Sequence, residues 1–173
     1  DLICSSLALQ WFEDAAAVAN YALEYHERLT ADTRLWRDTY YDSSLPYWLL
    51  DRLHSTLSYL ATGTCQWWKN GRFYAYEGVT CCAGTCTHVW NYAHGHARLF
   101  PELARSVREM QDFNPTGNGG GFHPDTGLVG FRSNDAYAAD GQCGTILKAY
   151  REHLMSAGDA FLKRNWPSIK KAL

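Results

Sequence analysis

Residues 73 to 92 concentrate the side chains of this chain that can do chemistry, and they read FYAYEGVTCCAGTCTHVWNY. Glu77 follows an alternating aromatic run and precedes Gly78, a pattern that places its carboxylate where a strand ends and a loop begins. Aromatic faces can stack on sugar rings, and a carboxylate among them can attack an anomeric carbon or activate water. Taken alone, the pattern equally fits a structural role in which Glu77 caps a loop or pairs with Arg72.

A second kind of chemistry comes from Cys81, Cys82, Cys86 and His88, four candidate metal ligands within eight residues. Thiolate and imidazole are preferred zinc ligands, so a structural zinc-binding module is an alternative function. Adjacent cysteines usually point in different directions, however, and the usual paired Cys-x2-Cys knuckles are missing from the sequence. These features favour an unmetallated cluster of small buried thiols. We therefore expect no bound metal and no other cofactor.

The composition excludes several classes of protein. With 46% hydrophobic and 20% charged residues, the chain has enough apolar material for a packed core. A formal net charge of -2 leaves no positive excess for a nucleic-acid partner. The apolar runs are far shorter than the roughly 20 residues that cross a bilayer, so no transmembrane segment is expected. Six cysteines in 173 residues are too sparse for a disulfide scaffold, which favours reduced thiols and a cytoplasmic location.

The periodicity of apolar residues predicts a mainly α chain with small β-hairpin excursions. Asn70-Gly71 between two aromatic arms predicts a tight type I′ hairpin, and the PDTG turn at 124–127 predicts a second one. The glycine-rich segment 114–121 is expected to be a loop. Helices are predicted over residues 7–29, 33–41, 46–61, 87–100, 101–113, 142–154 and 160–166, with a last one starting at Pro167.

Three blocks of the chain, in order, resemble one known family: TYYDSSLPYWLLDR, EGVTCCAGTCTHVWNYAHGHARLFPELARSVREMQDF and DGQCGTILKAYREHLMSAGDAFLKRNWPSIKKAL. Together they look like the catalytic domain of glycoside hydrolase family 116, which contains the non-lysosomal glucosylceramidase and bacterial β-glucosidases. The resemblance implies that residues 1–173 are an internal segment of an (α/α)6 barrel. Such a segment would need the remainder of its own catalytic domain as a partner and would expose apolar surface where that remainder belongs.

The resemblance also implies roles for particular residues. The family's nucleophile matches Glu77, in the pair Glu77-Gly78, and a β-glycoside or glycolipid would be the substrate. His88 stands where many members have an Asp that helps hold the sugar, and Asp140 keeps the second residue of a sugar-binding His-Asp pair whose first position is Ala139. Trp90, near Glu77, is expected to line the substrate site.

The implied reaction is a double displacement with retention of configuration, which requires an acid/base as well as a nucleophile. The family's acid/base corresponds to an Asp after Leu173, so we expect these 173 residues by themselves to be inactive. A helical carbohydrate-binding module without catalysis stays open as an alternative, because two family positions, those of His88 and Ala139, have changed.

Overall fold

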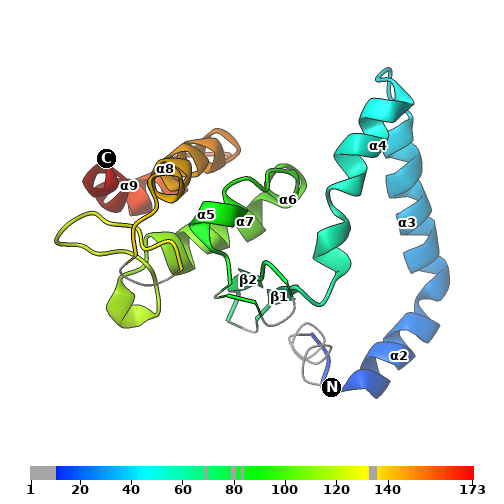
Figure 1. Cartoon of the computed structure of the whole chain (residues 1–173). Helices are drawn as coiled ribbons and strands as arrows, with labels where there is room; N and C mark the ends of the chain where they lie inside the picture. The colour runs from blue at the N-terminus through cyan, green and yellow to red at the C-terminus, as the bar shows by residue number, and fades with distance from the viewer. Residues whose placement is uncertain (1–10, 69, 79–80, 83, 133–135) are drawn as a thin grey trace. The chain divides into compact units, whose positions relative to one another are not determined.

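The structure, a computed structural model, describes residues 11–68, 70–78, 81–82, 84–132 and 136–173 (Figure 1). Contacts between Cα atoms divide the chain into two compact units, Asp1–Gly63 and Thr64–Leu173. The described residues are mainly helical, and the one sheet among them has two strands. The mainly α class with a small β excursion is therefore confirmed. The (α/α)6 barrel stays a prediction.

The first unit is a series of helices. They are α2 (Ala15–Glu24), α3 (His26–Tyr41), α4 (Tyr47–Ser55) and the 3-10 helix η1 (Ser58–Ala61). The single helix predicted over 7–29 is wrong within the described residues, because Asp14 starts a new helix by accepting a hydrogen bond from the Ala17 backbone N–H at 2.7 Å. Its portion before residue 11 lies outside the described part. Rings of Trp36, Tyr40 and His54 pack α3 against α4.

The second unit begins with the predicted hairpin. Strands β1 (Cys65–Trp67) and β2 (Phe73–Ala75) pair antiparallel with Gln66 opposite Tyr74. The turn differs from the predicted two-residue type, since the backbone N–H of Trp68 donates to the Arg72 carbonyl and three residues lie between them. Gly71 has φ +88°, as the left-handed position of a three-residue hairpin loop requires.

Short helices follow the hairpin, and two long ones end the chain. They are α5 (Thr87–Trp90), α6 (Gly95–Leu99), α7 (Pro101–Val107), the π-helical turn η2 (Arg108–Asp112), the 3-10 turn η3 (Thr116–Asn118), α8 (Ala139–Leu154) and α9 (Ala160–Ala172). The glycine-rich segment has only the short turn η3 as regular structure. The PDTG turn brings Phe122 and Val129 into an antiparallel bridge without forming extended strands.

The sequence predicts the wrong helix ends at two places in this unit, in residues 87–100 and at Pro167. The helix predicted over 87–100 is broken into α5 and α6, because the Lys148 ammonium group takes the carbonyls of Trp90 and Ala93 that a continuous helix would pair internally. Conversely, α9 continues through Pro167, where the sequence predicts the start of a new helix. Proline has a helix-compatible φ, so it can stay inside a helix, although it lacks the N–H of one helical hydrogen bond and its ring crowds the carbonyl four residues earlier.

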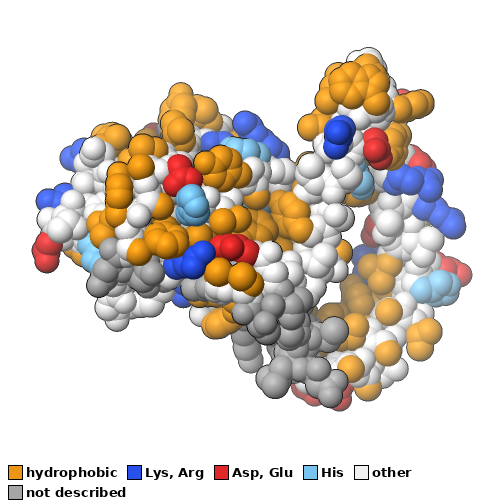
Figure 2. All heavy atoms as spheres, viewed as in Figure 1, with side chains coloured by type: hydrophobic (Ala, Val, Ile, Leu, Met, Phe, Trp, Pro, Cys, Tyr) orange, Lys and Arg blue, Asp and Glu red, His pale blue; other side chains and the backbone are white. Residues whose placement is uncertain are grey.

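The apolar core of the second unit lies between α8, α9 and the loops before α8. Its buried members are Phe113, Phe122, Val129, Ala149, Ile169 and Ala172. Other large apolar side chains remain on the surface, where Figure 2 shows them in orange. Leu147, Tyr150 and Leu154 on α8 are 67%, 61% and 63% exposed, so this face of α8 is not covered by the described residues of the second unit. No described helix has the length and apolar character needed to cross a membrane.

Candidate functional site

Glu77 lies two residues after the end of β2, where the chain leaves the hairpin. Its carboxylate forms an ion pair with the Arg132 guanidinium at 3.3 Å, and its side chain is 24% exposed. The predicted structural partner, Arg72, instead donates to the Gly119 carbonyl at 3.0 Å and to the Gln111 side chain at 3.2 Å. The Glu77–Arg72 pair is therefore wrong. Glu77 is accessible and held by a residue that lies 55 positions later in the chain.

The loop after Glu77 is held against the hairpin by specific contacts. The backbone N–H of Thr85 donates to the Ala75 carbonyl at 2.6 Å, and the Gln111 amide donates to the Thr85 carbonyl at 2.8 Å. Gly84 packs directly on the Tyr74 ring, so a Cβ at this position would collide with it. Thr85 has φ +53°, an unfavourable value for a β-branched residue. Strained backbone of this kind persists only where surrounding contacts impose it.

The predicted metal ligands do not converge as a group of four. Cys86 is fully buried, and its side chain accepts a hydrogen bond from Arg132, which raises the pKa of that guanidinium. His88 points to Asp140 instead. Among the residues described, the one group of three or more ligands with atoms within 4.8 Å of each other is Glu77, Cys81 and Cys82. The thiols of Cys81 and Cys82 lie 3.3 Å apart.

Asp140 is the centre of a second polar cluster, in the first turn of α8. The Nδ1 atom of His88 lies 2.9 Å from both of its carboxylate oxygens. The Tyr92 hydroxyl donates to Oδ2 at 3.0 Å, and the Gly141 backbone N–H donates to Oδ1 at 2.9 Å. The hydrogen bond from His88 is the main reason that the pKa of Asp140 is lowered, and Tyr92 and Gly141 act in the same direction. Asp140 is thus held as a carboxylate at an accessible position.

Trp90, which the sequence predicts to line the substrate site, packs its ring against other aromatic rings of the second unit. Its half-buried ring meets the Phe73 ring edge-on at 6.2 Å and the His96 ring at 5.9 Å. The aromatic side chain that reaches solvent beside Asp140 is Tyr92, which is 70% exposed.

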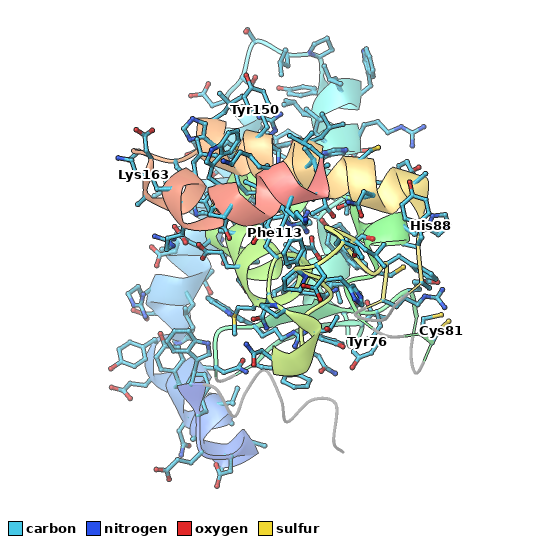
Figure 3. All side chains as sticks on the ribbon, turned by 90° about the vertical axis from the view of Figure 1, so that its left-hand side faces the viewer. Tyr76, Cys81, His88, Phe113, Tyr150 and Lys163 are labelled. Atoms are coloured by element: carbon cyan, nitrogen blue, oxygen red, sulfur yellow. The ribbon has the colours of Figure 1, made fainter. Side chains whose placement is uncertain are left out.

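Residues Phe131 and Arg132 connect the two clusters. The Arg132 guanidinium pairs with Glu77, while the Phe131 ring contacts the His88 ring at 6.2 Å. The Phe131 carbonyl also accepts from the Thr87 N–H at 2.8 Å, which ties this segment to the start of α5. Figure 3 shows His88 and Cys81 toward the same edge of the molecule.

A pocket of about 420 Å³ opens beside Asp140. Its lining includes Tyr92, Asp140, Cys143, Leu147, Lys148 and Arg151. Within the described residues, Glu77 does not line this pocket. Asp140 thus lines a cavity of small-ligand size, whereas Glu77 does not.

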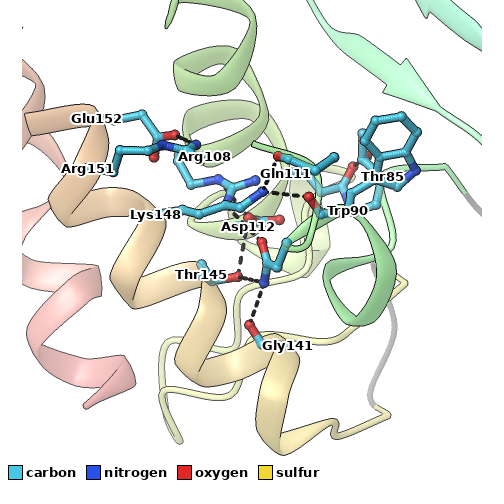
Figure 4. Close-up of polar contacts among 12 residues, drawn as sticks. Thr85, Trp90, Arg108, Gln111, Asp112, Gly141, Thr145, Lys148, Arg151 and Glu152 are labelled. Carbon is cyan, nitrogen blue, oxygen red and sulfur yellow. Dashed lines mark hydrogen bonds and ion pairs between the residues drawn. The ribbon is translucent and has the colours of Figure 1, made fainter. Parts of the chain in front are cut away.

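Polar contacts around Arg108, Asp112 and Gly141 connect the two helices that carry this cluster (Figure 4), and Asn91 takes part in them. Its side-chain amide donates to the Gly141 carbonyl at 2.9 Å, and its oxygen accepts from Arg108 at 3.2 Å. Arg108 also pairs with the fully buried Asp112 at 2.9 Å. Burial raises the pKa of Asp112 to about 6 even though Arg108 opposes that shift. This buried network fixes α5 against the start of α8, and thereby places His88 and Tyr92 beside Asp140.

Lys148 is another buried basic side chain of the network. Its ammonium group donates to the Ala93 carbonyl at 3.0 Å and also to the Trp90 carbonyl. Burial, followed by repulsion from Arg108 and Arg151, lowers the pKa of Lys148 to about 6. Lys148, held by these carbonyls, is one of the residues that line the pocket beside Asp140.

Arg132 and Asn91 are the site residues that sequence reasoning missed. Neither belongs to a motif, and each acts on a residue about 50 positions away along the chain. The residues around each position give no indication of its role, because each side chain acts on a partner from another segment of the chain.

No protein-family model matches this chain, and no curated protein matches it. The assignment of function therefore depends on the geometry of these residues and on the family resemblance of the sequence blocks.

Proposed function

We propose that this chain is part of a retaining β-glycosidase, of the β-glucosidase or glucosylceramidase kind, with Glu77 as the nucleophile. The observation that carries the proposal is the position of Glu77. An accessible carboxylate lies two residues after a hairpin strand, and an arginine from a distant segment pairs with it at 3.3 Å. A nucleophilic carboxylate needs this combination of access and fixed orientation.

In the proposed reaction, Glu77 attacks the anomeric carbon of a β-glycoside and forms a glycosyl ester as the leaving-group oxygen is protonated. Water, deprotonated by the acid/base, then attacks the anomeric carbon from the face opposite Glu77. The bond from that carbon to the Glu77 carboxylate breaks, and the sugar leaves with its original configuration. Arg132 keeps the carboxylate in place and compensates its charge before substrate binds. Retaining enzymes need an acid/base about 5 to 5.5 Å from the nucleophile. The family resemblance assigns that group to a residue after Leu173.

Asp140 and its partners are proposed to bind the sugar. A carboxylate has about four acceptor sites, so Asp140, which already accepts from His88, Tyr92 and Gly141, can still accept a hydrogen bond from a sugar hydroxyl. His88, where many family members have Asp, can donate a hydrogen bond as well as accept one, so the pattern of recognised hydroxyls should differ from theirs. Tyr92 offers the exposed ring for stacking that Trp90 was expected to supply.

Hydrolysis of nitrophenyl β-glycosides by the protein expressed from its complete reading frame tests this proposal. Glu77→Gln should lower turnover by about a thousandfold or more without changing the fold. Glu77→Ala should be rescued by azide, which replaces the missing nucleophile and gives the glycosyl azide of inverted configuration. Glu102→Gln, at a carboxylate that is 80% exposed, is the matched control and should keep full activity.

Near-normal turnover in Glu77→Gln would remove Glu77 from this role. Binding of glycosides with no hydrolysis by the intact protein would favour the non-catalytic carbohydrate-binding module. The proposal of a structural zinc-binding module predicts neither result.

A further inference from the structure

We propose that Glu77, Cys81 and Cys82 form a binding site for a soft divalent cation, with Zn²⁺ as the natural candidate. The sequence alone predicts no bound metal, and the site also differs from the four-ligand alternative, because a carboxylate from the preceding strand end takes the place of Cys86 and His88. It depends on metal chemistry at these three residues and not on the proposed glycosidase activity.

The backbone explains how two adjacent cysteines can serve one ion. Neighbouring side chains of an extended chain point to opposite sides. Cys82 instead has φ +59°, and the left-handed turn brings its thiol to 3.3 Å from that of Cys81. An antiparallel bridge between Gly78 and Cys81, with the Cys81 N–H donating to the Gly78 carbonyl at 3.3 Å, returns the chain toward Glu77. The three ligands are therefore brought together by the loop itself.

The distances suit a tetrahedral ion after small movements. Zn–S bonds of about 2.3 Å place two tetrahedral sulfurs about 3.8 Å apart, so the two thiols would need to separate by about 0.5 Å. A Zn–O bond of about 2.0 Å places a carboxylate oxygen about 3.5 Å from each sulfur. All three ligand atoms already lie within 4.8 Å of one another. Three protein ligands leave a fourth position open, as in zinc sites that bind water or substrate.

The charges of the ligands and their chemistry also favour a soft divalent cation. Two thiolates and one carboxylate carry three negative charges, which Arg132 and a divalent cation together would neutralise. Sulfur ligands select Zn²⁺ and other soft cations over Mg²⁺ or Ca²⁺, which prefer oxygen. Cys81 is exposed, so an ion can reach the site from solvent. Cysteine binds a metal as its thiolate, so binding to two thiols should release protons.

Calorimetric titration of the reduced, chelator-treated chain with ZnCl2 tests the proposal. We expect one equivalent of Zn²⁺ to bind, with proton release seen as a dependence of the heat on the buffer. Cys81→Ser, Cys82→Ser and Glu77→Gln should each weaken binding at least about tenfold. Cys143→Ser removes another exposed cysteine, on α8, and should leave binding unchanged. Co²⁺ in place of Zn²⁺ should give a thiolate-to-cobalt absorption band that both cysteine variants weaken.

Three results would overturn the proposal. The first is that the reduced chain shows no saturable binding of Zn²⁺. The second is that Cys81→Ser and Cys143→Ser bind Zn²⁺ with equal affinity. The third is that Glu77→Gln leaves the affinity for Zn²⁺ unchanged. Circular dichroism of each variant shows whether it is folded, and the cobalt spectrum reports ligation directly. Because none of these measurements uses a glycoside, failure of the metal site and failure of the proposed hydrolysis are distinguishable.

Discussion

Replacing Asn91 with alanine should destabilise the second unit by about 3 kcal/mol. Asn91 is 8% exposed, and the substitution removes its hydrogen bonds with the Gly141 carbonyl at 2.9 Å and with the Arg108 guanidinium at 3.2 Å. A neutral hydrogen bond contributes about 0.5–1.5 kcal/mol and one to a charged group about 1.5–3 kcal/mol. The longer contact with Thr145, at 3.4 Å, adds little. The two stronger bonds therefore account for the expected loss.

Urea unfolding followed by tryptophan fluorescence measures this loss. For a slope of about 2 kcal/mol per molar urea, the midpoint should fall by about 1.5 M. Asn91→Asp is the matched variant, since it keeps an acceptor for Arg108 but sets a carboxylate oxygen against the Gly141 carbonyl, and its midpoint should also fall. A decrease below about 0.5 M for Asn91→Ala would refute the reasoning that this amide holds α5 against α8.

Three further perturbations test other parts of the structure. Burial lowers the pKa of His96 to about 3, so the unfolded state, with an ordinary pKa near 6.5, takes up the proton first as the pH falls. This histidine should therefore lower the free energy of unfolding by about 2 kcal/mol between pH 7.5 and pH 5. Urea titrations at the two pH values measure the loss, and His96→Gln should abolish the contribution of His96. His88→Ala should raise the pKa of Asp140, measured by carboxyl NMR, and an unchanged value would contradict their hydrogen bond. Gly144→Ala would place a methyl group 2.7 Å from the Asn91 amide, so thermal unfolding should show destabilisation of about 1–2 kcal/mol, whereas an open helical site would gain stability.

The sequence predicted those features of the fold that depend on neighbours in the chain. The hairpin around Asn70-Gly71 and the helices from Tyr47 and Pro101 follow from turn residues and apolar periodicity within a few positions. The break between α5 and α6 could not be predicted, because the group that takes the helix carbonyls is Lys148, more than 50 residues later. Local propensity is a weak guide wherever a distant buried group competes for the same backbone.

Some features of the candidate site also follow from the sequence, and others only from the tertiary structure. The sequence by itself determined that Glu77 follows a strand and that thiols and an imidazole come shortly after it. Only the tertiary structure decided that Arg132 pairs with Glu77, that His88 belongs to Asp140, and that Cys81 and Cys82 share a side of their loop with Glu77. The physical reason is that residue types and short spacings specify chemical capacity and local backbone, whereas charge pairing and ligand convergence depend on distances between segments that only packing sets.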